Sequence, residues 1–238
     1  ILDFGTSGAL TQSSMVMYDR QTETIWTHFN GQAIAGELAG AQLEFFSSAV
    51  VSWADYRERF PDGLVLSRDT GHQRNYGVNP YPVYEALDDP FGQFITDEVD
   101  PRLEPNVRIV GIEVDGDAAA VLHESLFETG VIATEVGGQA VTVWNQPGTS
   151  SALDGQAVAG GEDVGATGVF VPAVGDQQLT FSRTGDGFTD AETGSTWTIF
   201  GEAVAGPLAG EELEPLPHLA TFWFAWGTFY EETRIIES

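Results

Sequence analysis

Residues 31–44 read GQAIAGELAGAQLE, and residues 201–214 read GEAVAGPLAGEELE. Nine of these fourteen positions are identical, at a constant offset of 170 residues. The same offset places Trp53 on Trp223. Because similarity at a fixed period is typical of repeated structural units, we expect the chain to contain two copies of one fold.

The match continues upstream of both stretches. Residues 19–26 (DRQTETIW) align with residues 190–197 (DAETGSTW) after one residue of slippage. Further back, residues 2–4 (LDF) align with residues 179–181 (LTF) if the first copy carries a few extra residues. An ordered series of matches indicates duplication more strongly than any one of them alone.

Each copy is predicted to contain short strands, a short helix and a final strand. Met15–Tyr18 and Thr24–His28 alternate between apolar and polar residues on either side of a polar turn, which is the pattern of a β-hairpin. The segment Ser52–Phe60 begins with an N-cap residue and ends before a proline, so it predicts a helix. Leu64–Leu66, which the offset places on residues 234–236, is predicted to be a buried strand.

The second copy has further elements at its front. We predict strands at Val107–Val114, Gln139–Trp144 and Gly168–Val171, a hairpin turn at Asp115-Gly116, and a short helix around Leu122–Glu128. None of these has a counterpart in the first copy.

The predicted fold is therefore α+β and β-dominated, with an internal repeat, halves related by a pseudo-two-fold axis, and a first copy truncated at its N-terminus. We divide the chain into residues 1–67 (the C-terminal half of copy one), residues 68–105 (a Pro/Tyr/Gly-rich connector packed on the body) and residues 106–238 (copy two). Buried backbone groups need partners, and the first copy begins at residues 2–4 without a counterpart of the strands that precede residue 179, so we expect a neighbouring strand to be missing. We expect an upstream segment to supply it, or self-association or strand addition at this edge.

The charge of the chain is extreme. Thirty-six acidic residues against nine basic ones give a net charge of −27, and all nine basic residues are arginine. The acidic residues are scattered, which indicates an acidic surface on a folded body. Salt screens the repulsion between such charges, because the Debye length falls to about 3 Å at 1 M. We expect a halophilic, archaeal protein of the cell surface or extracellular space, and no nucleic-acid partner, because phosphates bind Lys and Arg.

Several chemistries are excluded by what the sequence lacks. There is no cysteine, so this stretch carries no disulfide, zinc–thiolate site or thiol nucleophile. No apolar run approaches the roughly eighteen residues of a transmembrane segment. We expect no signal peptide within the first residues of this stretch. No cofactor is evident apart from the calcium considered below.

Several motifs are specific enough to compare with known families. They are Asp19-Arg20-Gln21-Thr22 with Trp26, the Gly/Ala-rich stretch from Gly31 to Gly40, Thr70-Gly71 with Arg74, Tyr76, Pro80, Tyr81 and Tyr84, and Thr193-Gly194-Ser195 with Trp197. Together they resemble the uncharacterised family called domain of unknown function 3179, over nearly the whole chain. The resemblance implies no established activity, and it implies an exported or envelope-attached bacterial or archaeal protein.

One motif of that family is missing here. Members carry a Cys-Pro-Leu-Cys segment after a Val/Thr-rich strand. The matching strand is Ala140–Trp144, and residues 145–148 read NQPG instead. If the first copy has the cysteine pair, we expect it upstream of Ile1, so the resemblance gives no support to thiol or thiolate–metal chemistry within this stretch.

A candidate pocket lies where basic residues cluster. It comprises Arg68, Asp69, His72, Arg74 and Tyr76, together with the repeated Trp53 and Trp223. Arginine binds oxyanions through two parallel hydrogen bonds, so the group could hold a carboxylate or a sugar. The alternative is that these arginines tie the connector down through ion pairs.

Two further sets of residues have competing interpretations. Trp26, Trp53, Trp197 and Trp223 recur in pairs, which favours core packing over aromatic platforms for a sugar. Asp186, Asp190 and Glu192 supply oxygen ligands of the kind that calcium prefers, although their spacing favours a solvated hairpin over a calcium site.

Two functions of different classes follow. The first is a non-catalytic binding or structural module, favoured because the sequence contains no convincing nucleophile, base or metal set. The alternative is a hydrolase-like enzyme with its site at Arg68, Asp69, His72 and Arg74. The ligand is not identified by the sequence.

Overall fold

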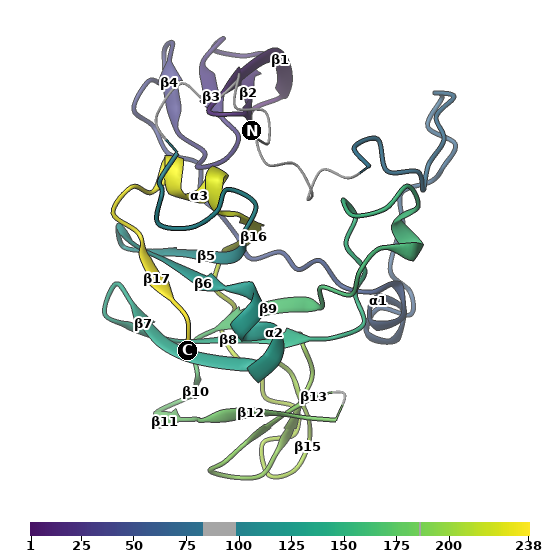
Figure 1. Ribbon diagram of the computed structural model, residues 1–238, viewed down its shortest axis with the longest axis vertical. Coiled ribbons are helices and arrows are strands. Elements are labelled where there is room, and N and C mark those ends of the chain that lie inside the picture. The colour runs from purple at the N-terminus through teal and green to yellow at the C-terminus, as the bar shows by residue number, and fades with distance from the viewer. Residues whose placement is uncertain (83–98, 186) are drawn as a thin grey trace.

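The computed structural model describes residues 1–82, 99–185 and 187–238 (Figure 1). The fold is β-dominated, as predicted, and its strands form several small sheets. The described helices are α1 (Trp53–Arg59), α2 (His123–Thr129) and α3 (Trp223–Phe229), with a 3-10 turn η3 (Val158–Gly160). The N-terminal sheet lies at one end of the molecule and a second four-stranded sheet at the other, with the remaining sheets between them (Figure 1).

The central sheet has the order β16-β5-β6-β17. Its strands are β5 (Arg108–Val114), β6 (Asp117–Leu122), β16 (His218–Phe222) and β17 (Arg234–Ile236). β5 and β6 form a hairpin whose turn, Asp115-Gly116, has positive φ at both residues, the geometry of a two-residue hairpin turn. β16 pairs antiparallel with β5, and β17 pairs parallel with β6. The hairpin is thus enclosed by two strands from near the end of the sequence.

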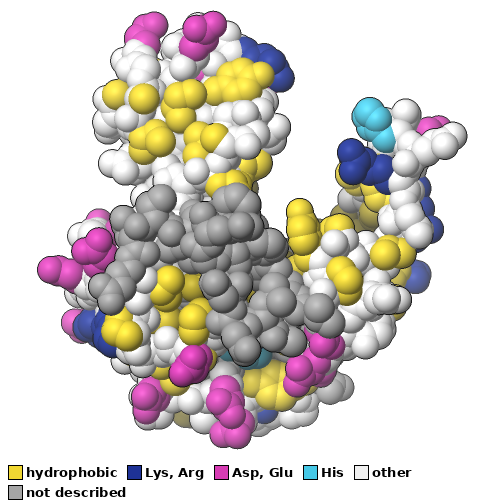
Figure 2. All heavy atoms as spheres, turned by 45° about the horizontal axis from the view of Figure 1, so that its top comes forward, with side chains coloured by type: hydrophobic (Ala, Val, Ile, Leu, Met, Phe, Trp, Pro, Cys, Tyr) yellow, Lys and Arg dark blue, Asp and Glu magenta, His cyan; other side chains and the backbone are white. Residues whose placement is uncertain are grey.

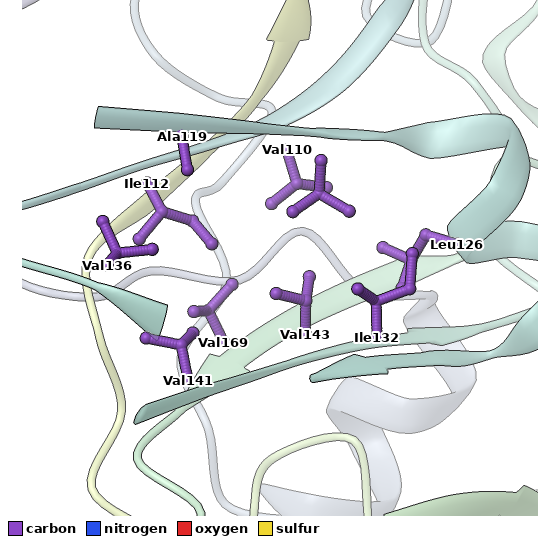
Figure 3. Packing of buried hydrophobic residues seen from close by; sticks show 10 residues of the cluster. Val110, Ile112, Ala119, Leu126, Ile132, Val136, Val141, Val143 and Val169 are labelled. Carbon is purple, nitrogen blue, oxygen red and sulfur yellow. The ribbon is translucent and has the colours of Figure 1, made fainter. Parts of the chain in front are cut away.

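A second sheet packs on the central one. It has the order β7-β8-β9, with β7 (Val131–Val136), β8 (Gln139–Gln146) and β9 (Ala166–Phe170). Alternate side chains of the two sheets meet in a core closed at one side by Leu126 of α2 (Figure 3). The members of this core are Val110, Ile112, Ala119, Val121, Leu126, Ile132, Val136, Val141, Val143 and Val169. Leu126 is the buried residue of α2, and it places that helix against the core.

Gly111 is the residue that lets α3 approach the central sheet. It lies in the middle of β5, and a Cβ added there would lie 2.2 Å from the Trp226 ring. No side chain fits in that space. The indole of Trp226 therefore covers the backbone of β5, and its Nε1 donates to Thr233 Oγ1 at 2.9 Å.

The two outer sheets have the same architecture. The N-terminal sheet has the order β1-β2-β3-β4, with β1 (Phe4–Thr11), β2 (Ser14–Asp19), β3 (Ile25–Thr27) and β4 (Ala33–Ala35). The other has the order β12-β13-β14-β15, with β12 (Phe181–Thr184), β13 (Gly187–Asp190), β14 (Thr196–Trp197) and β15 (Ala203–Ala205). A two-stranded ribbon, β10 (Ala173–Val174) and β11 (Gln177–Gln178), precedes the second.

Hydrogen bonds repeat between these two sheets residue by residue. Asp19 accepts from Trp26 Nε1 at 3.0 Å, and Asp190 accepts from Trp197 Nε1 at 2.9 Å. Thr22 Oγ1 donates to Asp19 as Thr193 Oγ1 does to Asp190. All four members of the two Asp–Trp pairs are buried. Core packing is thus confirmed for both tryptophans.

The prediction for Leu64–Leu66 is wrong. These residues form no strand, and Leu64 and Leu66 are 94% and 86% exposed. Their counterparts in β17 pair with β6, whereas no described strand lies beside residues 64–66. Trp53 is likewise 57% exposed, while Trp223 is fully buried, so core packing is wrong for Trp53. The helix itself is confirmed, with Ser52 accepting from Asp55 N at its start.

Polar contacts of Asn79 anchor the described part of the connector. Asn79 is buried, and its backbone N–H donates to Gln156 O at 2.9 Å. Tyr76 and Tyr81 are 39% and 57% exposed. Tyr84 lies outside the described residues.

At the chain's first strand, Phe4 pairs with Asp19 of β2, as Phe181 pairs with Asp190. β1 is an edge strand of its sheet, and β12 is an edge strand of its own.

Candidate functional site

A largely apolar cavity of about 790 Å³ lies between two parts of the protein. The N-terminal sheet is on one side, and the strand β16 and the helix α3 are on the other. One wall comes from β1, β2 and the segment after β3, and it includes Leu10, Met15 and Phe29. The opposite wall comes from β16 and α3. The described residues that β16 and α3 contribute to the lining are Leu219, Ala220, Thr221, Phe222, Phe224 and Ala225.

Phe29 joins the two walls. Its ring stacks on Phe229 with centroids 4.6 Å apart, and it meets Trp226 edge-on at 6.3 Å. Aromatic pairs at such separations contribute about 0.5–1.5 kcal/mol beyond the area that they bury. Phe29 is itself buried, so it attaches the N-terminal sheet to α3 and shapes the end of the cavity.

The polar part of the lining is small. Arg108, at the start of β5, is the arginine among the described lining residues, and its Nη2 donates to Ser151 Oγ at 2.9 Å. Its guanidinium lies 5.0 Å from the centre of the Phe222 ring. His28, Gln12, Ser13, Ser14, Thr221 and Tyr81 complete the polar lining. Apolar walls with a few convergent polar groups are typical of small-molecule sites.

A second cavity of about 590 Å³ lies on the other side of the same wall, because Phe29, Phe45 and Leu219 line both. Two of its residues are ionisable groups with shifted pKa values. Burial lowers the pKa of His218, which keeps the imidazole neutral, although the carbonyl of Leu216 acts in the opposite direction. Burial, with the charge of Glu113, raises the pKa of Tyr230 to about 12. Neither group is charged near neutral pH.

The residues predicted as a pocket from the sequence line neither of these two cavities. They are also absent from the lining of a further cavity beside α1, to which Asp55 and Arg59 contribute. Arg68, Asp69, His72 and Arg74 are all exposed. The helices α1 and α3, which begin at Trp53 and Trp223, lie far apart (Figure 1). In this segment Thr70 Oγ1 lies 2.6 Å from Tyr76 Oη.

The predicted calcium ligands have other partners. Burial alone would raise the pKa of Asp190, but hydrogen bonds from Trp197, Thr193 and Ser195 outweigh it and lower that pKa. Glu192 Oε2 accepts from Thr180 N at 2.8 Å. Asp186 lies outside the described residues. Among the residues that are described, no group of three or more His, Asp or Glu side chains could hold a metal ion.

Asp19 is the counterpart of Asp190 and behaves in the same way. Burial favours the neutral acid, yet hydrogen bonds from Thr22, Trp26 and Gln21 outweigh it and lower the pKa of Asp19 to about 2. Both carboxylates are thus ionised structural acceptors. Each carboxylate accepts hydrogen bonds both from the turn that follows it and from the tryptophan of the same sheet, and so joins the two.

Comparison with known proteins places the chain in a family. Residues 1–233 match the family described as "Protein of unknown function (DUF3179)". The chain belongs to the DUF3179 family. No curated protein and no solved structure matches it. The resemblance inferred from the motifs is confirmed, and it covers the cavity and both outer sheets of this DUF3179 chain.

In the described ranges, no helix of this DUF3179 chain combines the length and apolar composition that a membrane crossing requires.

Sequence reasoning missed the cavity, although one signal could have indicated part of it. Phe29 is placed on Ile199 by the same 170-residue offset, and both are buried. Matched apolar positions in a repeat indicate core residues. The other lining residues come from segments far apart in the sequence, and no periodic pattern connects them.

Proposed function

We propose that this DUF3179 protein is a non-catalytic binding module of the cell surface of a salt-loving, archaeal cell. Its ligand has an apolar body and an anionic end, and it occupies the cavity between the N-terminal sheet and β16–α3. The observation that carries this proposal is the apolar lining of that cavity with Arg108 at its edge. A guanidinium suits a carboxylate or a phosphate.

The roles of the buried carboxylates support a binding module over an enzyme. Asp19 and Asp190 are the buried charged side chains among the described residues, and both are engaged by tryptophan and threonine donors. A general acid or base needs a pKa near the working pH, whereas both of these pKa values are lowered. The hydrolase-like alternative rests on Arg68, Asp69, His72 and Arg74, which are exposed.

We further infer that the two halves arose by duplication. The shared strand order and the matched Asp–Trp hydrogen bonds support this, as does the constant sequence offset. A pseudo-two-fold relation between the halves is part of the same proposal.

Binding of dodecanoate tests the proposed ligand class. We expect titration calorimetry to show that dodecanoate binds and that dodecanol binds at least tenfold more weakly, because only the acid carries a charge for Arg108. Ala220 is exposed on β16 and lines the cavity. Ala220→Trp should fill the space and weaken dodecanoate binding at least tenfold.

Ala209→Trp is the matched control, because Ala209 is exposed in a turn that does not line the cavity. It should bind dodecanoate as the unmodified protein does. Equal affinity of all three proteins, or no heat of binding at all, would rule out this cavity as the site.

The proposed habitat predicts that stability rises with salt. The net charge is −27, so the acidic side chains repel one another. Asp and Glu side chains lie around the periphery of the face in Figure 2. The Debye length falls from about 30 Å at 0.01 M to about 3 Å at 1 M. Thermal melts in sodium chloride over that range should show a rising midpoint. A midpoint that does not change with salt would contradict the halophilic interpretation.

A further inference from the structure

The second cavity, of about 590 Å³, lies where the segment after β3 meets β5, β16 and α3. Its volume is within the range of small-molecule sites. Much of its described lining is aromatic, and the rings come from the segment 29–46 and from α3 with its C-cap residue. These aromatic residues are Phe29, Phe45, Phe46, Trp226 and Tyr230.

Three of the rings form one connected group. The ring of Tyr230 stacks on Trp226 with centroids 4.1 Å apart, and Phe29 meets these two rings at 6.5 and 6.3 Å. Phe45 and Phe46 are exposed, so their rings are accessible to a ligand. The faces of aromatic rings carry negative electrostatic potential and attract cations. The lining therefore favours a positively charged ligand.

Glu113 adds a negative charge beside these rings. It lies two residues after Gly111 in β5, and such residues share one face of a strand. That face is the one that Trp226 covers. The charge of Glu113 contributes to the raised pKa of Tyr230, about 12, so the carboxylate lies near the Tyr230 hydroxyl. Its Oε1 accepts from Gly116 N at 2.6 Å, which orients the carboxylate.

The protein supplies no positive charge to balance Glu113 within the described residues. The described lining of this cavity contains no arginine, and the chain contains no lysine. Burial lowers the pKa of His218, so the imidazole in this lining is neutral. The ion pairs of the described residues use other carboxylates, those of Asp3, Asp100, Asp117 and Glu202. Glu113 is thus available to a cation from solution.

We propose that the second cavity binds a small, free organic cation that carries a quaternary ammonium group and a short polar end. The ammonium group lies against the rings beside Glu113. A primary ammonium needs acceptors for three N–H donors, whereas a quaternary ammonium has no N–H and is the group that aromatic cages recognise. Rings therefore suit the quaternary ammonium better.

Uncharged amides bind the polar end of this ligand. Asn30, Gln32 and Gln42 line the cavity. Among the described residues, neither Asn30 Nδ2 nor the side-chain amide of Gln32 has a hydrogen-bond partner, so both can donate to a ligand hydroxyl. An anionic end would find no positive side chain in the described lining.

This inference does not rest on the proposed function, because the two cavities differ in charge. Arg108 lines the first cavity and not the second, whereas Glu113 lines the second and not the first. A substitution at Glu113 should therefore leave dodecanoate binding unchanged. Ala220→Trp, which fills the first cavity, should leave binding of the cation unchanged.

Titration calorimetry of the full 238-residue chain with choline tests the proposal. In 1 M sodium chloride the Debye length is about 3 Å, so general attraction to the acidic surface is screened. Choline should bind at least tenfold more tightly than its neutral analogue in which a tert-butyl group replaces the trimethylammonium group. The two molecules have the same shape, and only choline has the charge that the rings and the carboxylate attract. Phosphocholine should bind at least tenfold more weakly than choline, because its phosphate meets Glu113 and no cation.

Glu113→Gln should weaken choline binding at least threefold and leave binding of the tert-butyl analogue unchanged, since glutamine keeps the size and the acceptor for Gly116 N. Glu232→Gln is the matched control, because Glu232 is exposed, lies outside the cavity lining and gives the same change in net charge. It should bind choline as the unmodified chain does. Tyr230→Leu should weaken choline binding, and Tyr230→Phe should retain it, because the ring is the group that faces the cation.

Circular dichroism melts show whether each variant folds. Glu113 is exposed, so Glu113→Gln decides the outcome even if Tyr230→Leu is unfolded. Equal affinity for choline and its tert-butyl analogue, or no heat of binding with choline, would overturn the proposal. Choline binding that Glu113→Gln leaves unchanged would also overturn it, because the cation would then bind elsewhere on the acidic surface. Phosphocholine binding as tight as that of choline would indicate a lipid headgroup and overturn the assignment to a free cation.

Discussion

Trp144→Ala is expected to lower the free energy of unfolding by about 3–5 kcal/mol, the usual cost of replacing a buried tryptophan by alanine. Trp144 is 0% exposed and lies between two sheets. Its ring is 4.3 Å from Phe188 and 4.8 Å from both Phe170 and Phe181, measured between centroids. A domain has about 5–15 kcal/mol of stability in total, so this loss is large. Urea denaturation followed by far-UV circular dichroism measures it.

Trp53→Ala is the matched control, because Trp53 is 57% exposed. A surface substitution of this kind changes stability by at most about 0.5 kcal/mol. If both tryptophans had the same effect, Trp144 would not be the residue that joins the β7–β9 and β12–β15 sheets.

Asp190→Ala is expected to lower the free energy of unfolding by at least about 3 kcal/mol at neutral pH, since it leaves three donors unsatisfied at about 1–3 kcal/mol each. The orphaned donors are Trp197 Nε1, Ser195 N and Thr193 N. The folded-state pKa of Asp190 lies below the ordinary value of 3.8. Its contribution is therefore fully present above pH 3.8 and is lost as pH falls through the lowered value.

The unmodified protein should accordingly lose stability below pH 3.8, and the difference from Asp190→Ala should shrink there. Asp19 acts over the same range, since its pKa is lowered to about 2. Denaturation curves at neutral pH and at several values below pH 3.8 measure both effects. Asp176→Ala, at an exposed position in the β10–β11 turn, should change neither. A difference that stays constant with pH would show that Asp190 is not ionised in the fold.

The repeat made much of the fold predictable. Matched glycines and tryptophans located the hairpins of both outer sheets, and the Ser52 cap located α1. The strands predicted at Val107–Val114 and Gln139–Trp144 lie within two residues of the observed bounds of β5 and β8. These patterns are local, because the residues that form each turn, cap or strand lie within a few positions of one another in the sequence.

The failures have a common physical cause. The prediction that Leu64–Leu66 is buried assumed that equal sequence gives equal surroundings, but burial depends on what lies alongside. β17 is a strand because β6 lies beside it. Residues 64–66 have a sequence at least as apolar and no such neighbour among the described residues. Trp53 is exposed for the same reason.

The site was less predictable than the fold. The pocket predicted at the arginines near position 70 rested on the scarcity of basic residues in the sequence, which is a property of composition and not of proximity in the fold. The cavity is instead formed by residues around positions 10, 28, 108 and 220. Only the docking of the N-terminal sheet on α3 through Phe29 brings them together.

The position of β16 and β17 has a consequence for synthesis of the protein. The β5–β6 hairpin leaves the ribosome about a hundred residues before the strands that flank it. At roughly 5–20 residues per second, that interval lasts about 5–20 s. During this time both edges of an apolar hairpin are open to neighbouring nascent chains. Translation speed and chaperone access between residues 122 and 218 will therefore govern how much of the protein folds and how much aggregates.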